Sequence, residues 1–248
     1  MSKYVIVLIS GLFFLTEKAN SQALKFSFTQ VWTTTDRIVP LVNGPRVYDN
    51  TDYTTTISYE HFLKQQPISI FASYFEYAGS TIMLYERGAV ILNPGAVIVL
   101  GGGFSGVNIH RLDVGATYDF MKRRRKFYLQ AVLGLGLQVS KVTGVEIYNT
   151  LAPINGPYYV ESEPVSAESY NTTQIVPFAG VRTGFVFWKR LDIGLSFQGV
   201  YANKYFQKQF LKYSYKGVPQ KTAEYGATGT GIFVSLGIGY RFVTAKRN

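Results

Sequence analysis

The stretch from Phe127 to Val139, FYLQAVLGLGLQV, constrains the fold more than any other part of the chain. Its odd-numbered positions are all apolar, and its even-numbered positions include Tyr128, Gln130, Gly134, Gly136 and Gln138. A period of two is the repeat of a β-strand, and about 11 residues of tilted strand cross the hydrocarbon core of a bilayer. A spanning helix needs roughly 20 continuous apolar residues, which the polar positions exclude. The stretch is therefore predicted to be one strand of a membrane β-barrel.

The composition fits a surface that largely avoids water. Charged residues make up 16% of the chain, against about 25% in ordinary soluble domains, and aromatic residues reach 16%. The absence of cysteine excludes disulfides, thiolate metal sites and cysteine nucleophiles. The formal charge is +10, but the densest basic run, KRRRK at Lys122 to Lys126, fills a tight turn between two apolar strands. Contact with anionic lipid headgroups explains this placement better than nucleic-acid binding, which needs a basic face or groove.

The N-terminal segment has the features of a signal peptide. Lys3 precedes an apolar run from Tyr4 to Leu15, and a short polar region leads to Ala19, Asn20 and Ser21. Small residues at the third-last and last positions before the cut suit signal peptidase, so cleavage is predicted before Gln22. A retained membrane anchor would need roughly 20 apolar residues, more than this run offers. We therefore expect residues 1–21 to be a signal peptide and residues 22–248 to form an exported barrel domain.

The rest of the sequence divides into alternating segments whose connections are alternately short and long. The predicted strands are Leu24–Thr35, Tyr53–Leu63, Ile68–Ala78, Val107–Met121, Phe127–Val139, Ile175–Trp188, Leu191–Tyr205 and Gly231–Phe242. The third has aromatic residues on both faces, which leaves its orientation open. Thr143 to Gln174 is a polar, proline-containing loop, too long and too polar to cross a membrane.

This pattern predicts an all-β fold, an eight-stranded antiparallel transmembrane β-barrel of the up-and-down type. Short turns of such barrels face the periplasm, and long loops face the exterior of a Gram-negative cell. Backbone groups in lipid must all be paired, so the first strand is expected to close the sheet against the eighth. Ala89 to Leu92 and Ala96 to Leu100 read as an extra hairpin. We interpret it as an extension above the membrane, with a ten-stranded barrel as the alternative.

The polar half of each segment is predicted to face the lumen. A soluble barrel would carry many Lys and Glu outside, whereas Gly, Ser, Thr and Gln dominate here and can fill a narrow lumen. The charged residues assigned to the lumen balance in sign, and they are Lys25, Arg111, Arg182 and Arg241 with Glu60, Asp113, Asp119 and Asp192. Strand directions place Lys25, Asp119, Asp192 and Arg241 near the periplasmic end, and Arg111, Asp113 and Arg182 further out. A polar plug is favoured over a gate or ion path, because eight strands leave room for side chains only.

Aromatic residues near the strand ends fit two interfacial girdles. One comprises Phe120, Phe127, Phe187, Trp188, Tyr240 and Phe242, and the other comprises Trp32, Tyr53, Tyr201 and Tyr205. A stripe of core aromatics is the competing interpretation.

With these features the chain resembles the small OmpA/OmpX-type outer-membrane barrels, over nearly all of the mature sequence. The signal peptide, the eight alternating strands and the final strand GIFVSLGIGYRF, whose last residue is Phe242, carry the resemblance. In that class a last strand ending in an aromatic resembles the signal read by the barrel-assembly machinery, but here Val243 to Asn248 follow the aromatic. The resemblance implies residence in the bacterial outer membrane and contact with lipid and lipopolysaccharide, and it is weakly specific about function. We also expect a monomer.

Catalysis needs a general base, and the chain has only two histidines. His61 is next to Glu60 but on the opposite strand face, and His110 is assigned to the lipid face near the outer end of its strand, after Ser105. This placement resembles a lipid A deacylase, but the His-x-Ser spacing of that family is absent. No Gly-x-Ser-x-Gly elbow, His-Glu-x-x-His helix or phosphate loop occurs. The sequence therefore predicts no enzyme activity, no cofactor and no metal site.

The long loops carry the remaining functional signals. The third holds Glu146, Glu161, Glu163 and Glu168 with several tyrosines, and the fourth holds Lys208, Lys212, Lys216 and Lys221. Opposite charges indicate that the two loops pack together, although two independently solvated loops fit equally well, because exposed pairs contribute little.

Three hypotheses for function follow. The first is a non-enzymatic barrel with a structural or surface-binding role. Its tyrosine-rich loops would bind a surface ligand, a glycan or a protein partner, and its loop lysines would hold lipopolysaccharide phosphates. The second is a narrow, porin-like channel for small or apolar solutes. The third is an outer-membrane lipid-modifying enzyme centred on His110.

Overall fold

The computed structural model describes residues 21–40, 50–63, 66–84, 100–121, 126–151, 158–215 and 218–243. These residues form β1 (Ser21–Val39), β2 (Asn50–Phe62), β3 (Ile68–Leu84), β4 (Leu100–Asp119), β5 (Phe127–Leu151), β6 (Tyr158–Ser169), β7 (Thr172–Phe187), β8 (Leu191–Val200), β9 (Gln207–Tyr215), β10 (Val218–Pro219) and β11 (Ala223–Val243). No helix in these ranges is long and apolar enough to cross a membrane.

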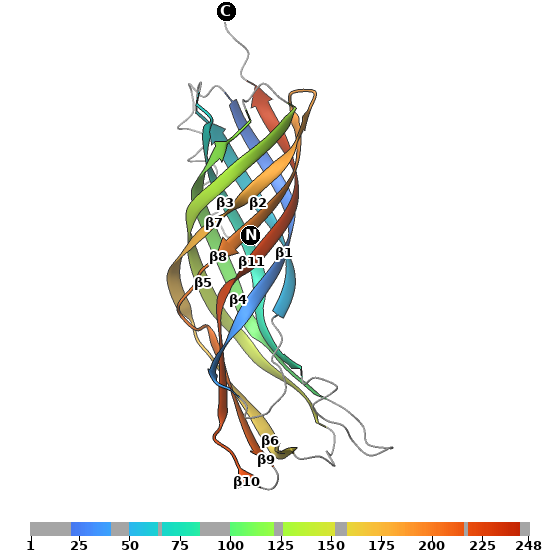
Figure 1. Cartoon of the computed structure of the whole chain (residues 1–248), viewed down its shortest axis with the longest axis vertical. Helices are drawn as coiled ribbons and strands as arrows, with labels where there is room; N and C mark the ends of the chain where they lie inside the picture. The colour runs from blue at the N-terminus through green and yellow to red at the C-terminus, as the bar shows by residue number, and fades with distance from the viewer. Residues whose placement is uncertain are drawn as a thin grey trace, which may run out of the picture.

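Eight of these strands close into a barrel, in the order β1-β2-β3-β4-β5-β7-β8-β11 (Figure 1). Each pairs antiparallel with its neighbours, and β1 closes the ring against β11 from Ser21 opposite Val243 to Thr33 opposite Gly231. The predicted closure of the first strand on the eighth is confirmed. Each of these eight described strands has a partner on both sides, which is what a sheet surrounded by lipid requires.

The ten-stranded alternative is wrong. β3 pairs directly with β4, from Ile68 opposite Tyr118 to Leu84 opposite Gly101, so no strand fits between them in the wall. The extra hairpin predicted over residues 89–100 lies, apart from Leu100, outside the described residues.

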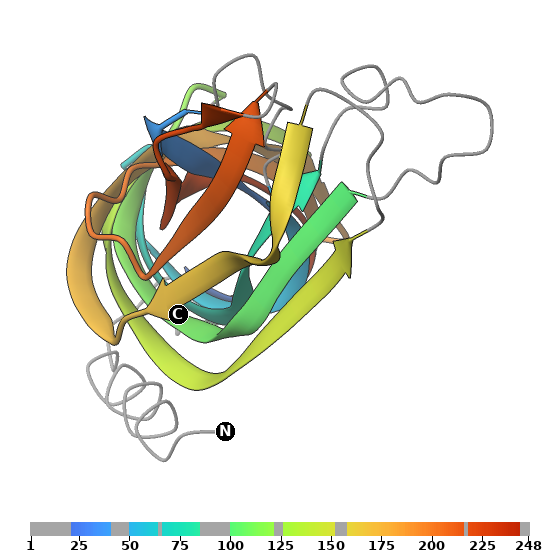
Figure 2. The same ribbon diagram turned by 90° about the horizontal axis from the view of Figure 1, so that it is seen from below.

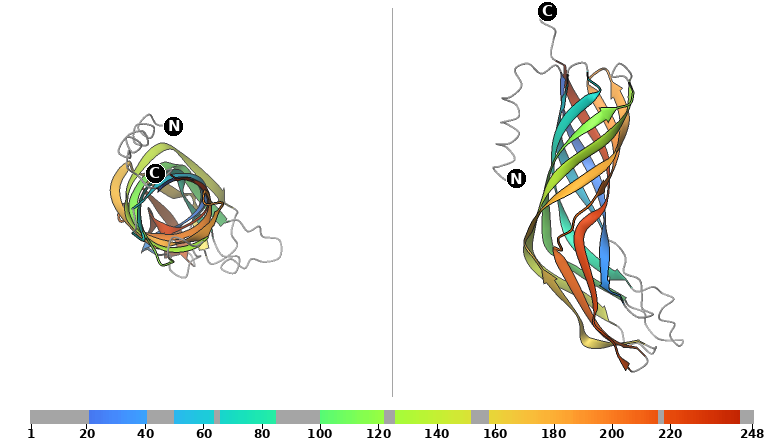
Figure 3. Two further views of the ribbon diagram at one scale, coloured as in Figure 1. Left: turned by 90° about the horizontal axis from the view of Figure 1, so that it is seen from above. Right: turned by 60° about the vertical axis from the view of Figure 1, so that its left-hand side comes forward.

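The two ends of the barrel differ. One end holds the β7–β8 turn, the ends of β2, β4 and β11, and the starts of β1, β3 and β5. We name it the turn end, and it is uppermost in Figure 1. The opposite end, where the strands continue past the ring, is the loop end (Figure 3). In an outer-membrane barrel the turn end faces the periplasm.

Side chains alternate between the outside and the lumen as the period of two predicts. On β5, Leu133, Leu135 and Leu137 are 69%, 57% and 44% exposed. Gly136, which lies between the last two leucines, and Gln138, which follows them, are buried. The assignment of the apolar half to the outside is therefore confirmed. The structure also settles the orientation of the third predicted strand, β3, because Phe71 and Phe75 are buried and Ile70 is exposed.

The loop end contains strands that the sequence did not reveal. β5 continues to Leu151, and β6 lies within the region predicted as a polar loop, while β8 ends at Val200 rather than at Tyr205. β9 pairs with β11 on one side, from Ala223 opposite Leu211 to Ala227 opposite Gln207, and with β6 on the other. We name β6, β9 and the adjoining ends of β11 (223–227) and β1 (35–39) the loop-end sheet. Figure 2 shows it at the mouth of the ring.

Candidate functional site

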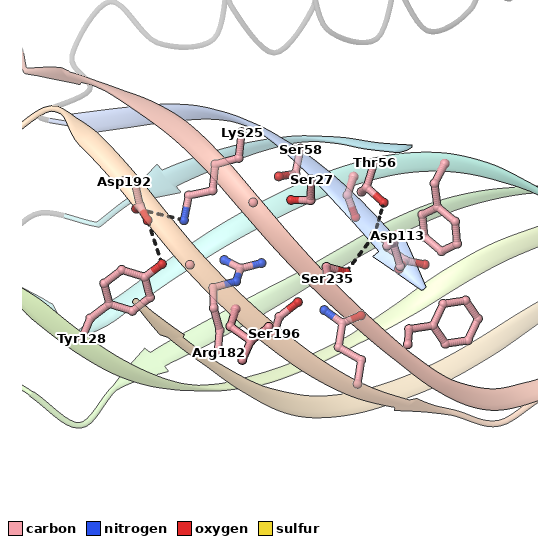
Figure 4. Close-up of a pocket in the computed structure, with 18 residues that line it drawn as sticks. Lys25, Ser27, Thr56, Ser58, Asp113, Tyr128, Arg182, Asp192, Ser196 and Ser235 are labelled. Atoms are coloured by element: carbon pink, nitrogen blue, oxygen red, sulfur yellow. Dashed lines mark hydrogen bonds and ion pairs between the residues drawn. The ribbon is translucent and has the colours of Figure 1, made fainter. Parts of the chain in front are cut away.

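Five of the charged residues predicted for the lumen meet near the turn end. Figure 4 shows three of them, Lys25, Arg182 and Asp192. Lys25 Nζ lies 2.7 Å from Glu60 Oε2 and 3.2 Å from Asp192 Oδ2. Arg182 Nη1 lies 3.2 Å from the same Glu60 oxygen, and Arg241 Nη2 lies 2.7 Å from Asp192 Oδ2. These side chains come from β1, β2, β7, β8 and β11, so one ion-pair network joins five strands across the lumen. We name it the turn-end network.

Two neutral hydroxyl groups donate further hydrogen bonds to the carboxylates of this network. Tyr128 Oη donates to Asp192 Oδ1 at 2.7 Å, and Ser69 Oγ donates to Glu60 Oε1. Gly184 and Gly194 lie opposite each other on β7 and β8 and leave the space that the Tyr128 hydroxyl occupies, since a Cβ on either would collide with it. Buried carboxylates tolerate ionisation only when paired and hydrogen-bonded. Both carboxylates meet that condition, so neither is free to act as a general base.

A small cavity lies next to the turn-end network, towards the loop end. It has a volume of about 50 Å³ and is lined largely by hydroxyl groups, including those of Ser27, Thr56, Ser58, Ser196 and Ser235 (Figure 4). Thr29 Oγ1 lies 2.9 Å from Thr56 Oγ1 and 2.8 Å from Ser235 Oγ, so one threonine joins two neighbouring strands. A cavity of this size and polarity has room for a few water molecules.

Arg111 and Asp113 form a separate, fully buried ion pair at mid-height. Arg111 Nε donates to Asp113 Oδ1 at 2.6 Å, and the two side chains are 0% and 2% exposed. The rings of Phe75, Phe178 and Phe233 surround the guanidinium, with its Cζ 5.4, 5.2 and 5.1 Å from their centroids. Both Nη atoms lack a hydrogen-bond partner within the described residues, and the electron-rich ring faces take the place of one. We name these five residues the Arg111 cage.

A third group of side chains lies across the lumen towards the loop end. Gln138 Nε2 and Gln174 Nε2 both donate to the Thr228 carbonyl, at 2.9 and 3.2 Å. Gln174 Oε1 accepts from the backbone N–H of Lys204 at 2.9 Å, which ties residues 201–206 to the inner wall. Phe206 is fully buried, and its ring fills the space that a side chain at position 79 would need.

The structure brings together most, but not all, of the charged residues assigned to the lumen. Arg182 was placed with Arg111 and Asp113, but it belongs to the turn-end network, because strand tilt shifts β7 relative to β4. Asp119 lies at the turn-end rim, where it accepts a hydrogen bond from the Met121 N–H at 2.9 Å. The phenylalanines of the Arg111 cage were not predicted. For Phe75, the sequence signal was the presence of aromatic residues on both faces of β3.

Outside the lumen, His110 has two polar neighbours on the wall. Its Nδ1 lies 2.9 Å from Tyr74 Oη and 3.3 Å from Glu76 Oε2, and Asn108 Nδ2 donates to the other oxygen of Glu76 at 3.3 Å. The His110 side chain is partly exposed on the outer face of β4 near the loop end, as the sequence predicted. His61 also faces away from the lumen, opposite to Glu60. Within the described residues, no group of three or more His, Asp or Glu side chains is arranged to hold a metal ion.

The loop-end sheet is held by contacts between the acidic and basic loops. β6 pairs with β9, with Glu168 opposite Lys208, and Lys208 Nζ also lies 2.7 Å from Glu224 Oε1. Of the two alternatives left open by the sequence, contact between the loops is the one found for β6 and β9. The hydrogen bond to Glu224 raises the pKa of Lys208. Tyr170 Oη donates to Glu168 Oε2, and this hydrogen bond raises the pKa of Tyr170 to about 12, because ionisation would place two negative charges together.

The outer surface completes the definition of the class. Phe120, Trp188, Tyr240 and Phe242 are exposed at the turn end, and Tyr53 and Tyr201 are exposed towards the loop end. Tyr205 departs from the predicted girdle, since its ring lies 5.3 Å from Lys208 Nζ in the loop-end sheet. Between the girdles the exposed wall is apolar. A closed antiparallel barrel with an apolar outer band between aromatic girdles is an integral protein of the bacterial outer membrane.

Three solved outer-membrane proteins are similar to this chain. The outer membrane protein OprG from Pseudomonas aeruginosa is 9% identical, with a TM-score of 0.46 over 92% of this chain and 98% of that chain. A major outer membrane protein from Thermus thermophilus is 10% identical, with a TM-score of 0.45 over 88% and 99%. Ail, the attachment invasion locus protein of Yersinia pestis, in complex with the heparin analogue sucrose octasulfate, is 12% identical, with a TM-score of 0.43 over 90% and 99%. No protein-family model and no curated protein sequence matches the chain.

Proposed function

We propose that this chain is a non-enzymatic outer-membrane barrel with a closed lumen, which acts as a structural or surface-binding protein through its loop end. The observation that carries the proposal is the Arg111 cage. Its guanidinium is fully buried between three aromatic rings at mid-height, and Gln138 beside it is also fully buried. Water or ions passing along the lumen would have to displace a paired charge and its aromatic neighbours.

The turn-end network and the Phe206 group support the same conclusion. Lys25, Glu60 and Asp192 are almost completely buried near the turn end, and Phe206 is completely buried towards the loop end. The cavity between the turn-end network and the Arg111 cage has a volume of about 50 Å³, which leaves room for only a few water molecules. A lumen filled at three successive levels favours a plug over a narrow channel.

Conductance in planar lipid bilayers tests the closed lumen. We expect the purified barrel to insert without unitary currents, and folding is checked by its faster gel mobility before boiling than after. A variant carrying Arg111→Gly and Phe206→Gly serves as a control for whether the assay registers a widened lumen. Stable unitary currents from the unmodified protein would favour the narrow-channel alternative for small or apolar solutes.

The loop-end sheet supports the surface-binding role. The pairing of β6 with β9 and the Lys208–Glu224 ion pair fix strands that lie beyond the apolar wall. Exposed on this sheet are the charged residues Asp36, Arg37 and Glu168 and the apolar residue Ile38, and Val218 is exposed on the neighbouring β10. A preformed surface loses little conformational freedom on binding, so it binds a ligand more tightly than mobile loops of the same composition.

One observation favours a second candidate, a lipid-modifying enzyme. His110 and Glu76 are within ion-pair distance on the outer wall, where a lipid acyl ester would approach. Replacing His110 with alanine and comparing lipid A mass profiles tests it, with Glu76→Gln as a second variant. An unchanged lipid A profile in cells expressing the unmodified protein and either variant removes this candidate.

A further inference from the structure

The turn between β7 and β8 holds an exposed tryptophan in an unusual backbone conformation. Trp188 and Lys189 have φ angles of 46° and 62°, in the left-handed region that bulky side chains rarely adopt. The Arg190 N–H donates to the Phe187 carbonyl at 3.0 Å and closes the turn. As a result the Trp188 indole projects from the turn end and is 85% exposed. Glycine or asparagine would fit this turn with less strain, so the tryptophan calls for another explanation.

Arg190 follows Lys189 in the chain, and its side chain lies along the outside of the barrel. Arg190 Nη1 donates to Tyr240 Oη at 2.9 Å, and the Tyr240 ring is exposed on the lipid-facing wall beside Phe242, with ring centroids 5.2 Å apart. Arg241, the next residue after Tyr240, points the opposite way and pairs with Asp192 in the lumen. Two neighbouring guanidinium groups at this end therefore have different roles, one inside and one outside.

Among the described residues, the Arg190 guanidinium on the outside of the barrel has basic neighbours and no carboxylate partner. The Lys126 carbonyl accepts from the Val186 N–H at 2.7 Å, which places the start of β5 beside the β7–β8 turn. Lys126, Lys189 and Arg190 are all exposed. Within the described part of the chain, no Asp or Glu lies within ion-pair distance of these three residues. The turn end, uppermost in Figure 1, thus carries exposed positive charge beside the aromatic residues Trp188, Tyr240 and Phe242.

We propose that Arg190, Tyr240, Lys189 and Trp188 form a binding site for the phosphate of an anionic glycerophospholipid in the leaflet around the turn end. The guanidinium keeps N–H groups free beside the one that binds Tyr240, and the Tyr240 hydroxyl, which accepts from Arg190, still has its own proton to donate. Lys189 adds a second positive charge. Tryptophan prefers the boundary between headgroups and acyl chains, so the exposed indole of Trp188 at the turn end suits a lipid headgroup as the ligand. This site requires membrane insertion but does not depend on whether the lumen conducts.

Native mass spectrometry of the barrel with bound lipid tests the proposal. The unmodified protein is expected to retain phosphatidylglycerol in preference to phosphatidylcholine, and Arg190→Gln is expected to weaken phosphatidylglycerol binding about fivefold, the effect typical of one basic residue near an anionic membrane surface. Arg37→Gln removes an exposed arginine at the loop end and is the matched control, which should leave phosphatidylglycerol binding unchanged. Tyr240→Phe keeps every charge and removes the hydroxyl. Weaker phosphatidylglycerol binding by this variant would show that the arrangement of the site, rather than net charge, holds the lipid.

Three outcomes would overturn the proposal. Equal losses from Arg190→Gln and Arg37→Gln would show that only the overall charge matters, and unchanged binding in Arg190→Gln and Tyr240→Phe would show that no such site exists. In the third experiment, inorganic phosphate is added at millimolar concentration to the barrel with bound phosphatidylglycerol. Displacement of the lipid by phosphate alone would identify a free anion as the ligand. Gel mobility before boiling confirms that each variant is folded, and Tyr240→Phe keeps the test decisive if Arg190→Gln fails to fold.

Discussion

Arg111 needs strong compensation for its lost hydration, because its guanidinium is completely buried with one carboxylate partner. Within the described residues its one hydrogen bond runs from Nε to Asp113, at 2.6 Å, and three phenylalanine rings surround the rest of the group. Removing a charge from water costs several kcal/mol, which a close ion pair and ring faces can offset only together. The stability of the Arg111 cage therefore depends on keeping both charges or neither.

This dependence gives the first prediction. Asp113→Ala leaves an uncompensated buried guanidinium and is expected to lower the free energy of unfolding by about 3–5 kcal/mol. The double variant Arg111→Met with Asp113→Leu removes both charges, so it should lose markedly less. Urea unfolding in lipid vesicles, followed by tryptophan fluorescence, measures both values. A double variant as unstable as Asp113→Ala would show that the ion pair itself, rather than the orphaned charge, supplies the stability.

Gly194 carries the second prediction. A Cβ at this position would collide with the Tyr128 hydroxyl, which donates to Asp192 in the turn-end network. Gly194→Ala is expected to cost about 1–3 kcal/mol of unfolding free energy through overpacking and the displaced hydrogen bond. Gly199 lies on the same strand, and its Cβ would come no closer than 3.9 Å to the Ala179 carbonyl. Gly199→Ala is the control and should stay within about 0.5 kcal/mol.

At the level of elements, the wall strands were predictable and the loop-end strands were not. A wall strand has lipid on one face and a narrow lumen on the other, so the period of two is visible in β5. β6 and β9 lie beyond the apolar band, and their sequences, YYVESEPVSAES and QKQFLKYSY, show no alternation of apolar and polar residues. Phe75 and Phe178 were missed for a related reason, because an aromatic side chain suits lipid and a filled lumen equally well.

The junction of β6 and β7 gives a prediction about pH. The hydrogen bond to Glu168 raises the pKa of Tyr170 to about 12, so the folded state favours the neutral phenol. Its contribution to stability is fully present below the unfolded pKa of about 10 and is lost as the pH rises towards 12.

Absorbance at 295 nm measures this titration. The difference between the unmodified barrel and Tyr170→Phe should show tyrosinate forming near pH 12. Glu168→Gln removes the negative charge, and Tyr170 should then titrate closer to its usual pKa of about 10. A transition near pH 10 with Glu168 intact would contradict the hydrogen bond.

At the level of the whole molecule, the balance of lumen charges was predictable but their pairing was not. Alternation alone assigned Lys25, Glu60, Asp113 and Asp192 to the inside, because each lies on the polar half of its segment. Which residues then meet depends on the stagger of eight tilted strands, a property of the closed ring rather than of any one segment. Arg182 shows the difference, since its partner Glu60 lies 122 residues away on β2.

The orientation of the barrel gives the last prediction. The chain has no cysteine, so a single introduced thiol reports one position without background. Lys221 is exposed at the loop end and Lys189 is exposed at the turn end, and surface substitutions of this kind change stability little. On intact cells, a maleimide too large to cross the outer membrane should label Lys221→Cys and should leave Lys189→Cys unlabelled. Lys189→Cys should react once the outer membrane is permeabilised, because the thiol is exposed and only the membrane keeps the maleimide from it in intact cells. The reverse pattern would place the three short turns outside the cell and would assign the lipid site at Arg190 to the outer leaflet.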